Sequence, residues 1–278
     1  MSTGTFAWNF PNVEIKLPEG LPGKQLLDFR PFDQWWRTLS ESLRGQDNPT
    51  HPFHASPYRL EAIEIQSVDH FGSRIGFIKL KATMRNGDGE IIPGAVFMRG
   101  GSVAMLIIVS EDASEADAES HVILTVQPRI PAGSLSFVEL PAGMIDDSGT
   151  FSGAAAKEIK EETGLDIKED ELIDMTQLAI KQQSEEDKDG GCEVHLQEGS
   201  YPSPGGSDEF IPLFVVRKQM PKQEIEALRG KLTGLREHGE KITLKLVRLE
   251  DVWKVAARDG KTLAAIALYE ALNREGLL

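Results

Sequence analysis

The chain has 278 residues, of which 40% are hydrophobic and 27% are charged, and its formal net charge is −14. This composition is ordinary for a globular protein, and the length allows one large domain or two modest ones. The negative charge argues against a nucleic-acid backbone or an anionic membrane as the main partner. It also means that a phosphate-bearing substrate would need metal ions and local arginines in order to bind.

Signals of compartment or anchoring are few. The single cysteine, Cys192, excludes an internal disulfide and is compatible with a reducing compartment. No apolar run approaches the ~20 residues that a membrane-spanning helix needs. Residues 1–10 have no basic region followed by an apolar stretch, so a secretory signal is not expected. We therefore expect a cytoplasmic protein, and an organellar protein whose leader has been removed is the alternative.

Residues 1–57 are expected to form an N-terminal arm with one short helix. Within Phe29–Arg44, the aromatic residues Phe32, Trp35 and Trp36 fall on one side of an amphipathic helical pattern. The two adjacent tryptophans are interpreted as packing against a core or an interface. Stacking on a nucleobase is the alternative role for them.

Residues 58–100 are predicted to form a small antiparallel sheet. Apolar and polar residues alternate at 63–66 and again at 78–82, which indicates strands. The segment 86–89, Asn-Gly-Asp-Gly, is a strong turn signal. A further strand is expected to begin near Ala95.

Residues 101–278 are the third expected domain, and it begins with two strands. Val103–Val109 is a continuous apolar run, which is typical of a strand buried on both faces. His121–Val126 predicts another strand, which leads to Arg129. The planar fork of donors on an arginine suits a diphosphate.

The stretch from 140 to 165 organises this domain. Leu-Pro-Ala-Gly at its start indicates a turn that ends a strand. A helix is predicted to follow, capped by Thr150 or Ser152 and ended by Gly164. The helix carries glutamates three or four residues apart, so that their carboxylates share one face: Glu158, Glu161 and Glu162. Such a face suits a hard divalent cation, and a solvated acidic surface is the alternative.

This stretch resembles the signature of the Nudix hydrolase family, Gx5Ex7REUxEExGU, where U is a bulky aliphatic residue. The matching positions are Gly143, Glu158, Ile159, Glu161, Glu162, Gly164 and Leu165. Two positions depart from it, because Gly149 replaces the first glutamate and Lys157 replaces the arginine. Lysine keeps the charge but loses the two-point grip on a carboxylate. Asp146 or Asp147 is a candidate replacement for the missing acid.

The resemblance implies an α/β protein, namely a Nudix α/β/α sandwich with a mixed sheet plus an N-terminal antiparallel sheet subdomain. It implies Mg²⁺ or Mn²⁺ held by Glu158, Glu162 and the backbone carbonyl of Ala142, with Glu161 and Glu162 serving catalysis. It also implies a homodimer that the N-terminal sheet helps to build. A monomer whose sheet only extends the core is the alternative.

Two further elements resemble the branch of the family that cleaves ADP-ribose and ADP-sugars. One is a Q-x-R element, Gln127-Pro-Arg129, which makes Arg129 an expected substrate-binding residue, and Glu139 is expected to bind substrate beside it. A simple ion pair between these two side chains is the alternative. The other is an S-P-G-G-x-x-E loop that ends at Glu209, in which the glutamate helps to activate the attacking water. Glu209 is therefore an expected catalytic residue.

The remaining elements are predicted from periodicity and turn signals. The expected strands are Leu172–Lys181, Phe210–Val216 and Ile242–Leu249, and the expected helices are Pro221–Leu235 and Lys261–Arg274. The polar segment Ser184–Ser200 is expected to be a loop. The run T-G-L-R-E-H-G-E at 233–240 and F-G-x-R-I-G-F near Phe71 extend the resemblance to the plant plastid ADP-sugar diphosphatases.

We therefore expect Mg²⁺-dependent hydrolysis of the diphosphate bond of nucleoside diphosphate sugars, which yields a nucleoside monophosphate and a sugar phosphate. ADP-ribose, ADP-glucose and UDP-glucose are all candidate substrates. A Nudix-fold protein that senses nucleotide sugars without cleaving them is the alternative, and Gly149 and Lys157 favour it. A third possibility is a structural dimerisation module that binds no nucleotide.

Overall fold

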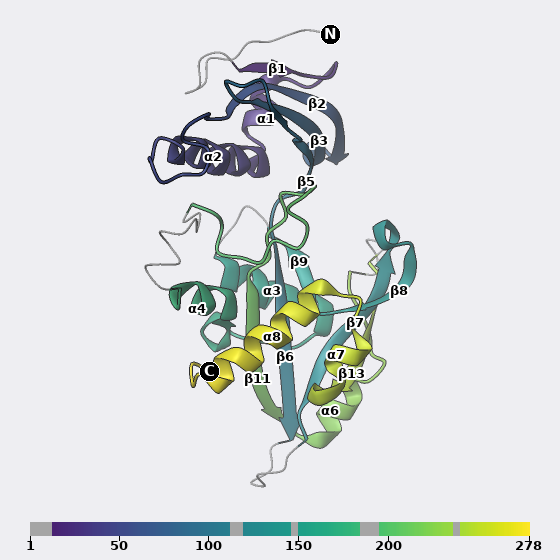
Figure 1. The fold of residues 1–278 in the computed structure, drawn as a ribbon. Helices are drawn as coiled ribbons and strands as arrows, with labels where there is room; N and C mark the ends of the chain where they lie inside the picture. The colour runs from purple at the N-terminus through teal and green to yellow at the C-terminus, as the bar shows by residue number, and fades with distance from the viewer. Residues whose placement is uncertain (1–12, 112–118, 146–149, 184–194, 236–239) are drawn as a thin grey trace. The chain divides into compact units, whose positions relative to one another are not determined.

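The computed structural model describes residues 13–111, 119–145, 150–183, 195–235 and 240–278. They form two compact units (Figure 1). The first unit contains the described residues of 1–101, 183–197 and 203–209, and the second contains those of 102–182, 198–202 and 210–278. No helix in the described part of the chain is long and apolar enough to cross a membrane.

The first unit is built on a five-stranded sheet. Its strands are β1 Glu14–Lys16, β2 Arg59–Phe71, β3 Arg74–Arg85, β4 Ile91–Ile92 and β5 Ala95–Met98. β2, β4 and β5 all pair antiparallel with β3, as expected, and β1 adds one parallel pairing with β2. The predicted turn between β3 and β4 forms around Asn86, whose side-chain oxygen accepts hydrogen bonds from the backbone N–H groups of Asp88 and Glu90.

Two helices, α1 Gly23–Leu27 and α2 Arg30–Gly45, complete this unit. On α2, Phe32 is fully buried and Trp36 is 5% exposed, and their ring centroids lie 6.4 Å apart. Both belong to the core that also contains Ile63 and Leu80 of the sheet, and Trp35 packs against that core. The interpretation of the tryptophans as packing residues is confirmed, and Trp36 is too deeply buried to stack on a nucleobase.

The second unit contains an eight-stranded mixed sheet. Its strands are β6 Ser102–Glu111, β7 His121–Arg129, β8 Ser134–Glu139, β9 Ala142–Met144, β10 Ile173–Asp174, β11 Leu213–Met220, β12 Leu232–Thr233 and β13 Ile242–Arg248. The main path runs β10-β11-β6-β7-β13-β12, while β8 pairs with β7 and β9 pairs with β6. β11 runs parallel to β6, and the other pairs are antiparallel.

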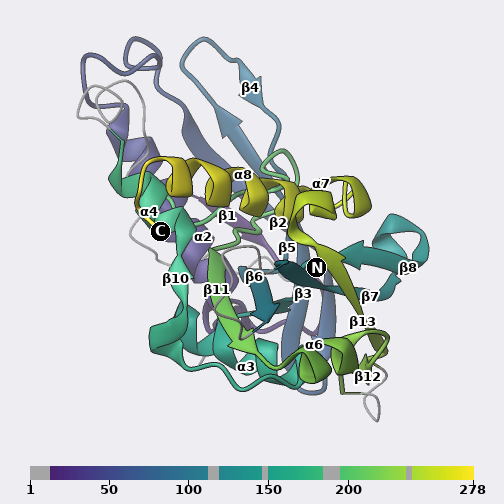
Figure 2. The same cartoon turned by 90° about the horizontal axis from the view of Figure 1, so that it is seen from below.

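Helices cover both faces of this sheet, which confirms the predicted α/β/α sandwich. They are α3 Phe151–Thr163, α4 Met175–Lys181, α6 Lys222–Leu228, α7 Val252–Val255 and α8 Gly260–Arg274. Figure 2 shows α8 on one side of the sheet and α3 and α6 on the other. The buried run 103–109 of β6 supplies alternate residues to the two cores, since successive side chains of a strand point to opposite faces.

The predicted strand Leu172–Lys181 is wrong over most of its length. Only Ile173–Asp174 is extended, and the rest forms α4. Asp174 is the cap of this helix, because its carboxylate accepts a hydrogen bond from the backbone N–H of Gln177 at 2.9 Å. The cap overrides the strand-like pattern, and Met175 then packs into the core.

The predicted helix Pro221–Leu235 is too long. α6 ends at Leu228, and the chain turns so that Leu232 and Thr233 pair with β13. Leu232 is 62% exposed, so it does not extend the buried helical face that the spacing suggested. The predicted strand at 242–249 and the terminal helix are confirmed, within one residue at the ends that differ.

Candidate active site

The Leu-Pro-Ala-Gly turn leads from β8 into β9, at the edge of β6. The backbone N–H of Met105 donates to the carbonyl of Pro141 at 3.0 Å. Within the pair of strands, Ala142 lies opposite Ala104. The turn is thereby held against the central strand of the sheet, with β9 facing α3.

Helix α3 begins and ends where the local sequence predicts. The Thr150 hydroxyl accepts a hydrogen bond from the backbone N–H of Gly153 at 3.0 Å, which makes Thr150 the cap. Gly164 ends the helix in the left-handed conformation, with φ of +77°, which glycine adopts without a steric penalty. Ala155 and Ile159 are fully buried in the core, so this side of the helix packs against the sheet.

Glu158 lies directly against the backbone of β9. A Cβ atom built on Gly143 would lie 1.8 Å from Cδ of Glu158 and 2.0 Å from its Oε1. No side chain larger than hydrogen fits at this position unless the carboxylate moves. This contact explains in physical terms why a glycine stands at 143.

Glu162 is almost completely buried, with 1% of its surface exposed. Its Oε2 accepts a hydrogen bond from the backbone N–H of Ala142 at 3.0 Å, so it approaches the same short strand as Glu158. Burial and then the charge of Glu158 raise the pKa of Glu162 to about 8, against the opposing effect of the Ala142 N–H. Two carboxylates therefore converge on β9, and the charge of Glu158 disfavours ionisation of Glu162.

This pair fits a hard divalent cation, because a cation removes the repulsion that raises the pKa of Glu162. Glu161 is half-buried on the same helix. Within the described ranges, no three His, Cys, Asp or Glu side chains form a metal-binding group by themselves. Mg²⁺ commonly takes one or two carboxylates and completes its shell with water and substrate oxygens, so a two-carboxylate site remains chemically sufficient. The ligand assignment to Ala142, Glu158 and Glu162 stays a prediction.

Arg129 and Glu139 form a direct ion pair, which was the alternative interpretation of these two residues. The Nε atom of Arg129 lies 2.6 Å from Oε1 of Glu139. The Glu139 side chain is 3% exposed, whereas that of Arg129 is 40% exposed. Contact of either residue with a substrate stays a prediction, and the exposed side chain of Arg129 is compatible with it.

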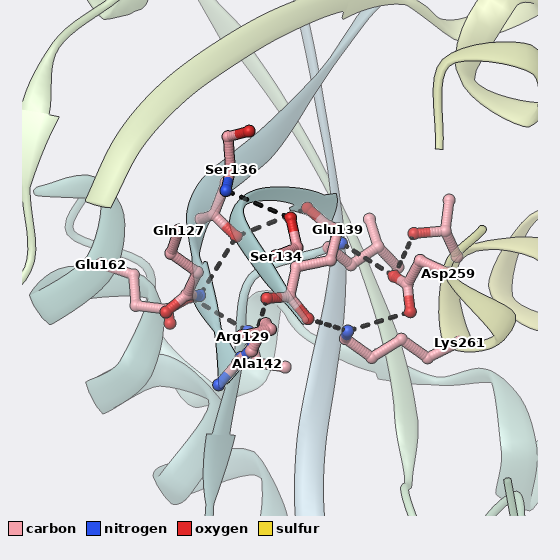
Figure 3. A network of polar contacts seen from close by, with 12 residues as sticks. Gln127, Arg129, Ser134, Ser136, Glu139, Ala142, Glu162, Asp259 and Lys261 are labelled. Carbon is pink, nitrogen blue, oxygen red and sulfur yellow. Dashed lines mark hydrogen bonds and ion pairs between the residues drawn. The ribbon is translucent and has the colours of Figure 1, made fainter. Parts of the chain in front are cut away.

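The start of α8 supplies two residues that the sequence pattern did not single out. Lys261 pairs with Oε2 of Glu139 and also lies 3.0 Å from Asp259. Oδ2 of Asp259 accepts hydrogen bonds from the backbone N–H of Leu140 at 3.2 Å and from the hydroxyl of Thr262 at 2.5 Å. Figure 3 shows Arg129 and Lys261 on either side of the Glu139 carboxylate. The only sequence signal was Asp-Gly-Lys-Thr before an apolar helix, which is typical of an ordinary helix start.

The loop that ends at Glu209 belongs to the first unit. The carboxylate of Asp208 accepts hydrogen bonds from the backbone N–H groups of Arg99 at 2.8 Å and Gly100 at 3.0 Å. Burial raises the pKa of Asp208, and these two N–H groups lower it in part. Next to it, Glu209 lies 3.1 Å from the Nη1 of Arg99. The proximity of Glu209 to the glutamates of α3 stays a prediction.

Several residues singled out in the sequence lie outside the described ranges. They are Asp146, Asp147, Gly149, Cys192, Arg236, Glu237 and His238, together with most of the Ser184–Ser200 segment. The departure at Lys157 is in α3, where its side chain is exposed.

The fold is an α/β/α sandwich in which an acidic helix packs its glutamates against a glycine turn. This combination is typical of one class of hydrolase. The NUDIX domain family matches residues 101–266. The chain also resembles "Nudix hydrolase 14, chloroplastic" of Arabidopsis thaliana, with 42% identity over 258 residues that cover 92% of this chain and 74% of the relative. The chain therefore belongs to the Nudix hydrolase family.

Two further similarities are weaker, one in coverage and the other in sequence identity. "Putative nudix hydrolase 2" of Caenorhabditis elegans is 52% identical over 44 residues, which cover 16% of this chain and 19% of that protein. A solved structure, "Crystal structure of ADP compounds hydrolase", superimposes with a TM-score of 0.50 at 15% identity, covering 80% of this chain and 97% of the other. At that identity the match supports the fold alone.

Proposed function

We propose that the protein hydrolyses the diphosphate bond of ADP-linked sugars such as ADP-ribose and ADP-glucose. Water adds to one phosphorus, the bridging oxygen leaves on the other phosphate, and AMP and a sugar phosphate are released. The observation that carries the proposal is the convergence of Glu158 and Glu162 on the turn at Ala142 and Gly143. Membership of the Nudix family supports the hydrolase chemistry, and the Gln127-Pro-Arg129 element and the loop that ends at Glu209, which resemble the branch that cleaves ADP-ribose and ADP-sugars, guide the choice of substrate.

In this proposal, Glu158, Glu162 and the carbonyl of Ala142 hold Mg²⁺ or Mn²⁺, and Glu161 supports them. The cation supplies neutralisation of the diphosphate charge and acidifies bound water. The protein's own part is to keep two carboxylates together at one place, with Glu162 shielded from solvent and oriented by the Ala142 N–H. A protein with a net charge of −14 needs such a device to accept an anionic substrate.

Arg129 is the proposed contact to the diphosphate, with Glu139 behind it. Glu139 holds the Nε atom of Arg129, and no other described residue hydrogen-bonds the guanidinium. The terminal nitrogens are therefore available to an anionic ligand, and arginine binds phosphate oxygens in a two-point manner.

Glu209 is the proposed base that orients or deprotonates the attacking water. The ion pair with Arg99 and the two hydrogen bonds of the neighbouring Asp208 restrict the loop that carries it. A carboxylate on a restrained loop loses less conformational freedom when it acts, which favours catalysis. The Glu209→Gln variant should lower kcat while the affinity for substrate is kept.

The proposal is tested by product analysis with Mg²⁺ and, separately, ADP-ribose, ADP-glucose and UDP-glucose. AMP should form from the ADP-sugars, and the Glu162→Gln variant should lose at least the roughly 10- to 100-fold in activity that is lost when a residue that only orients a metal ligand is changed. Glu226→Gln is the matched control, since Glu226 is an exposed glutamate paired with Arg229 on α6. Full activity of the Glu162→Gln variant would refute the assigned role.

The second candidate is a sensor that binds nucleotide sugars without cleaving them. Lys157, in place of the family's arginine, is the observation that favours it. Titration of ADP-ribose by calorimetry, with and without Mg²⁺, separates the two functions when combined with product analysis. Binding without AMP would establish the sensor and exclude the hydrolase.

We also propose that the protein is a homodimer. Phe71 and Phe97 are 50% and 44% exposed on the sheet of the first unit, and both rings contact Phe77. Exposed aromatic clusters of this kind fit an interface between copies. Light scattering should give twice the mass of one chain for the wild type. The Phe71→Ser, Phe97→Ser double variant should give the mass of a single chain.

A further inference from the structure

The residues around Glu139 form a line of alternating charges across the second unit. It runs from Arg129 through Glu139 and Lys261 to Asp259, so that two cations and two carboxylates balance. Three of the four side chains are nearly buried, with exposed fractions of 3% for Glu139, 12% for Lys261 and 7% for Asp259. Only Arg129 reaches solvent to a large extent, at 40%.

Each buried carboxylate in this line has a donor on both of its oxygens. Glu139 binds Arg129 through Oε1 and Lys261 through Oε2 (Figure 3). Asp259 binds Lys261 through Oδ1, while its Oδ2 accepts the backbone N–H of Leu140. A buried carboxylate oxygen without a donor is costly, and both oxygens of Glu139 and Oδ1 of Asp259 each have one donor among the described residues, while Oδ2 of Asp259 also accepts from the Thr262 hydroxyl.

We propose that Lys261 and Asp259 are positioning residues for both halves of the site. Lys261 occupies one oxygen of Glu139, so that Arg129 is held through Nε alone and keeps its terminal nitrogens for a diphosphate. Asp259 fixes the backbone at Leu140, immediately before the turn that presents Ala142. The N-terminal end of α8 thus connects Arg129, which binds the diphosphate, to the turn against which Glu158 and Glu162 pack.

The physical consequence of removing Lys261 follows from charge. Glu139 would then keep only Arg129 as a cation, Asp259 would lose its ion pair, and the oxygen of Glu139 that Lys261 occupied would lack a partner. Arg129 is exposed enough to move, and a guanidinium satisfies both oxygens of a carboxylate by two-point pairing. We expect it to turn toward Glu139 and withdraw its terminal nitrogens from the ligand.

The positioning role rests on the proposed function for its substrate, and it is tested with Lys261→Met, Lys261→Arg and a control. Lys254→Met is the matched control, because Lys254 is an exposed lysine paired with Asp251 in the same unit. With ADP-ribose and Mg²⁺, Lys261→Met should raise KM about tenfold or more with a smaller change in kcat, since ground-state binding is what is lost. Lys261→Arg should have a KM close to that of the wild type, and Lys254→Met should match the wild type.

A second readout needs no catalysis. In protein labelled with ¹⁵N-arginine, the Nε–H signal of Arg129 is assigned by its loss in the Arg129→Lys variant. Without ligand, Lys261→Met should shift this signal and slow the solvent exchange of a terminal N–H of Arg129, and Lys254→Met should leave both unchanged. If the wild type cleaves nothing, the proposed function fails, while this spectrum still decides the positioning role.

Unchanged KM together with an unchanged Arg129 signal in Lys261→Met would overturn the inference. If that variant does not fold because of its uncompensated carboxylates, the Glu139→Gln, Lys261→Met double variant removes one charge of each sign. We expect it to fold and to show a raised KM, because Arg129 then lacks its anchor. Wild-type KM in the double variant would show that the Glu139–Lys261 pair has no positioning role.

Discussion

The backbone of Gly143 and the carboxylate of Glu158 are in such close contact that a Cβ atom at 143 would lie 1.8 Å from Cδ of Glu158. Any side chain added at this signature glycine would therefore displace the carboxylate of Glu158. Glu158 is half-buried, so it has room to move away, but only by leaving the position opposite β9 that it shares with Glu162.

Gly143→Ala should therefore impair activity more than stability. We expect the displaced carboxylate to weaken Mg²⁺-dependent activity by roughly 10- to 100-fold, as for other changes that misplace a metal ligand. Activity as a function of Mg²⁺ concentration, with thermal unfolding beside it, measures this. Gly45→Ala is the control, since a Cβ atom there meets nothing within 4 Å. Equal activity of the two variants would contradict the prediction.

Thr150→Ala should shorten or destabilise the start of α3. The Thr150 hydroxyl caps the helix at the backbone N–H of Gly153, and loss of such a cap costs about 0.5–2 kcal/mol. Ser152→Ala is the matched variant, because Ser152 hydrogen-bonds Glu169 but does not cap the helix. Urea unfolding should place Thr150→Ala below Ser152→Ala in free energy of unfolding. The reverse order would show that Ser152 is the more important residue.

Asp208→Ala should destabilise the first unit by about 1–3 kcal/mol, because the partly buried N–H groups of Arg99 and Gly100 lose their acceptor. Hydrogen exchange at those two amides should accelerate, and guanidinium unfolding reports the free energy. Asp47→Ala, an exposed aspartate of the same unit, should change stability by less than about 0.5 kcal/mol. Unchanged hydrogen exchange at the amides of Arg99 and Gly100 would show that the Asp208 carboxylate does not hold these two N–H groups.

Asp174 should make stability depend on pH. Burial raises the pKa of this helix cap, and the backbone N–H groups of Gln177 and Thr176 oppose that effect. Between the ordinary pKa of 3.8 and the raised pKa of the folded state, the folded protein holds more protons than the unfolded chain. The contribution of Asp174 to stability therefore falls as pH rises through this window, and it stays low above it.

Asp174→Asn does not titrate and keeps an oxygen that can accept from Gln177. The free energy of unfolding of this variant, relative to the wild type, should therefore increase as pH rises from about 3.5 to 7. Urea unfolding at each pH gives the difference. A difference that is constant or decreases with pH would show that burial does not dominate the environment of Asp174.

The local elements of the site could be predicted from the sequence. The cap at Thr150, the end of α3 at Gly164 and the buried face at Ala155 and Ile159 depend on residues within a few positions of one another. The buried strand β6 was equally predictable, since a continuous apolar run has few other places in a fold. Family resemblance added the expected roles of the glutamates, which spacing alone left open.

Short elements next to competing signals were less predictable. The apolar content of the segment 175–181 favours a strand, but the carboxylate of Asp174 caps it as a helix. The helical spacing of Leu232 suggested that it would be buried on a helix. In the structure Leu232 is exposed and lies in a short strand that pairs with β13. In both cases the energies of local propensity are small, and tertiary context decides between alternatives of similar stability.

By itself, the sequence determined the acidic helix and the turn on which it packs, because these depend on near neighbours and on periodicity, whereas the class of fold followed from the resemblance of this stretch to a family signature. Only the tertiary structure decided that Lys261 lies on Glu139, 122 positions away, and that Asp208 holds the backbone at Arg99, 109 positions away. Pairs of residues so far apart in the sequence produce no repeating pattern from which they could be predicted. They form because a buried charge or N–H group must find a partner wherever the packing of the sheet and helices brings one.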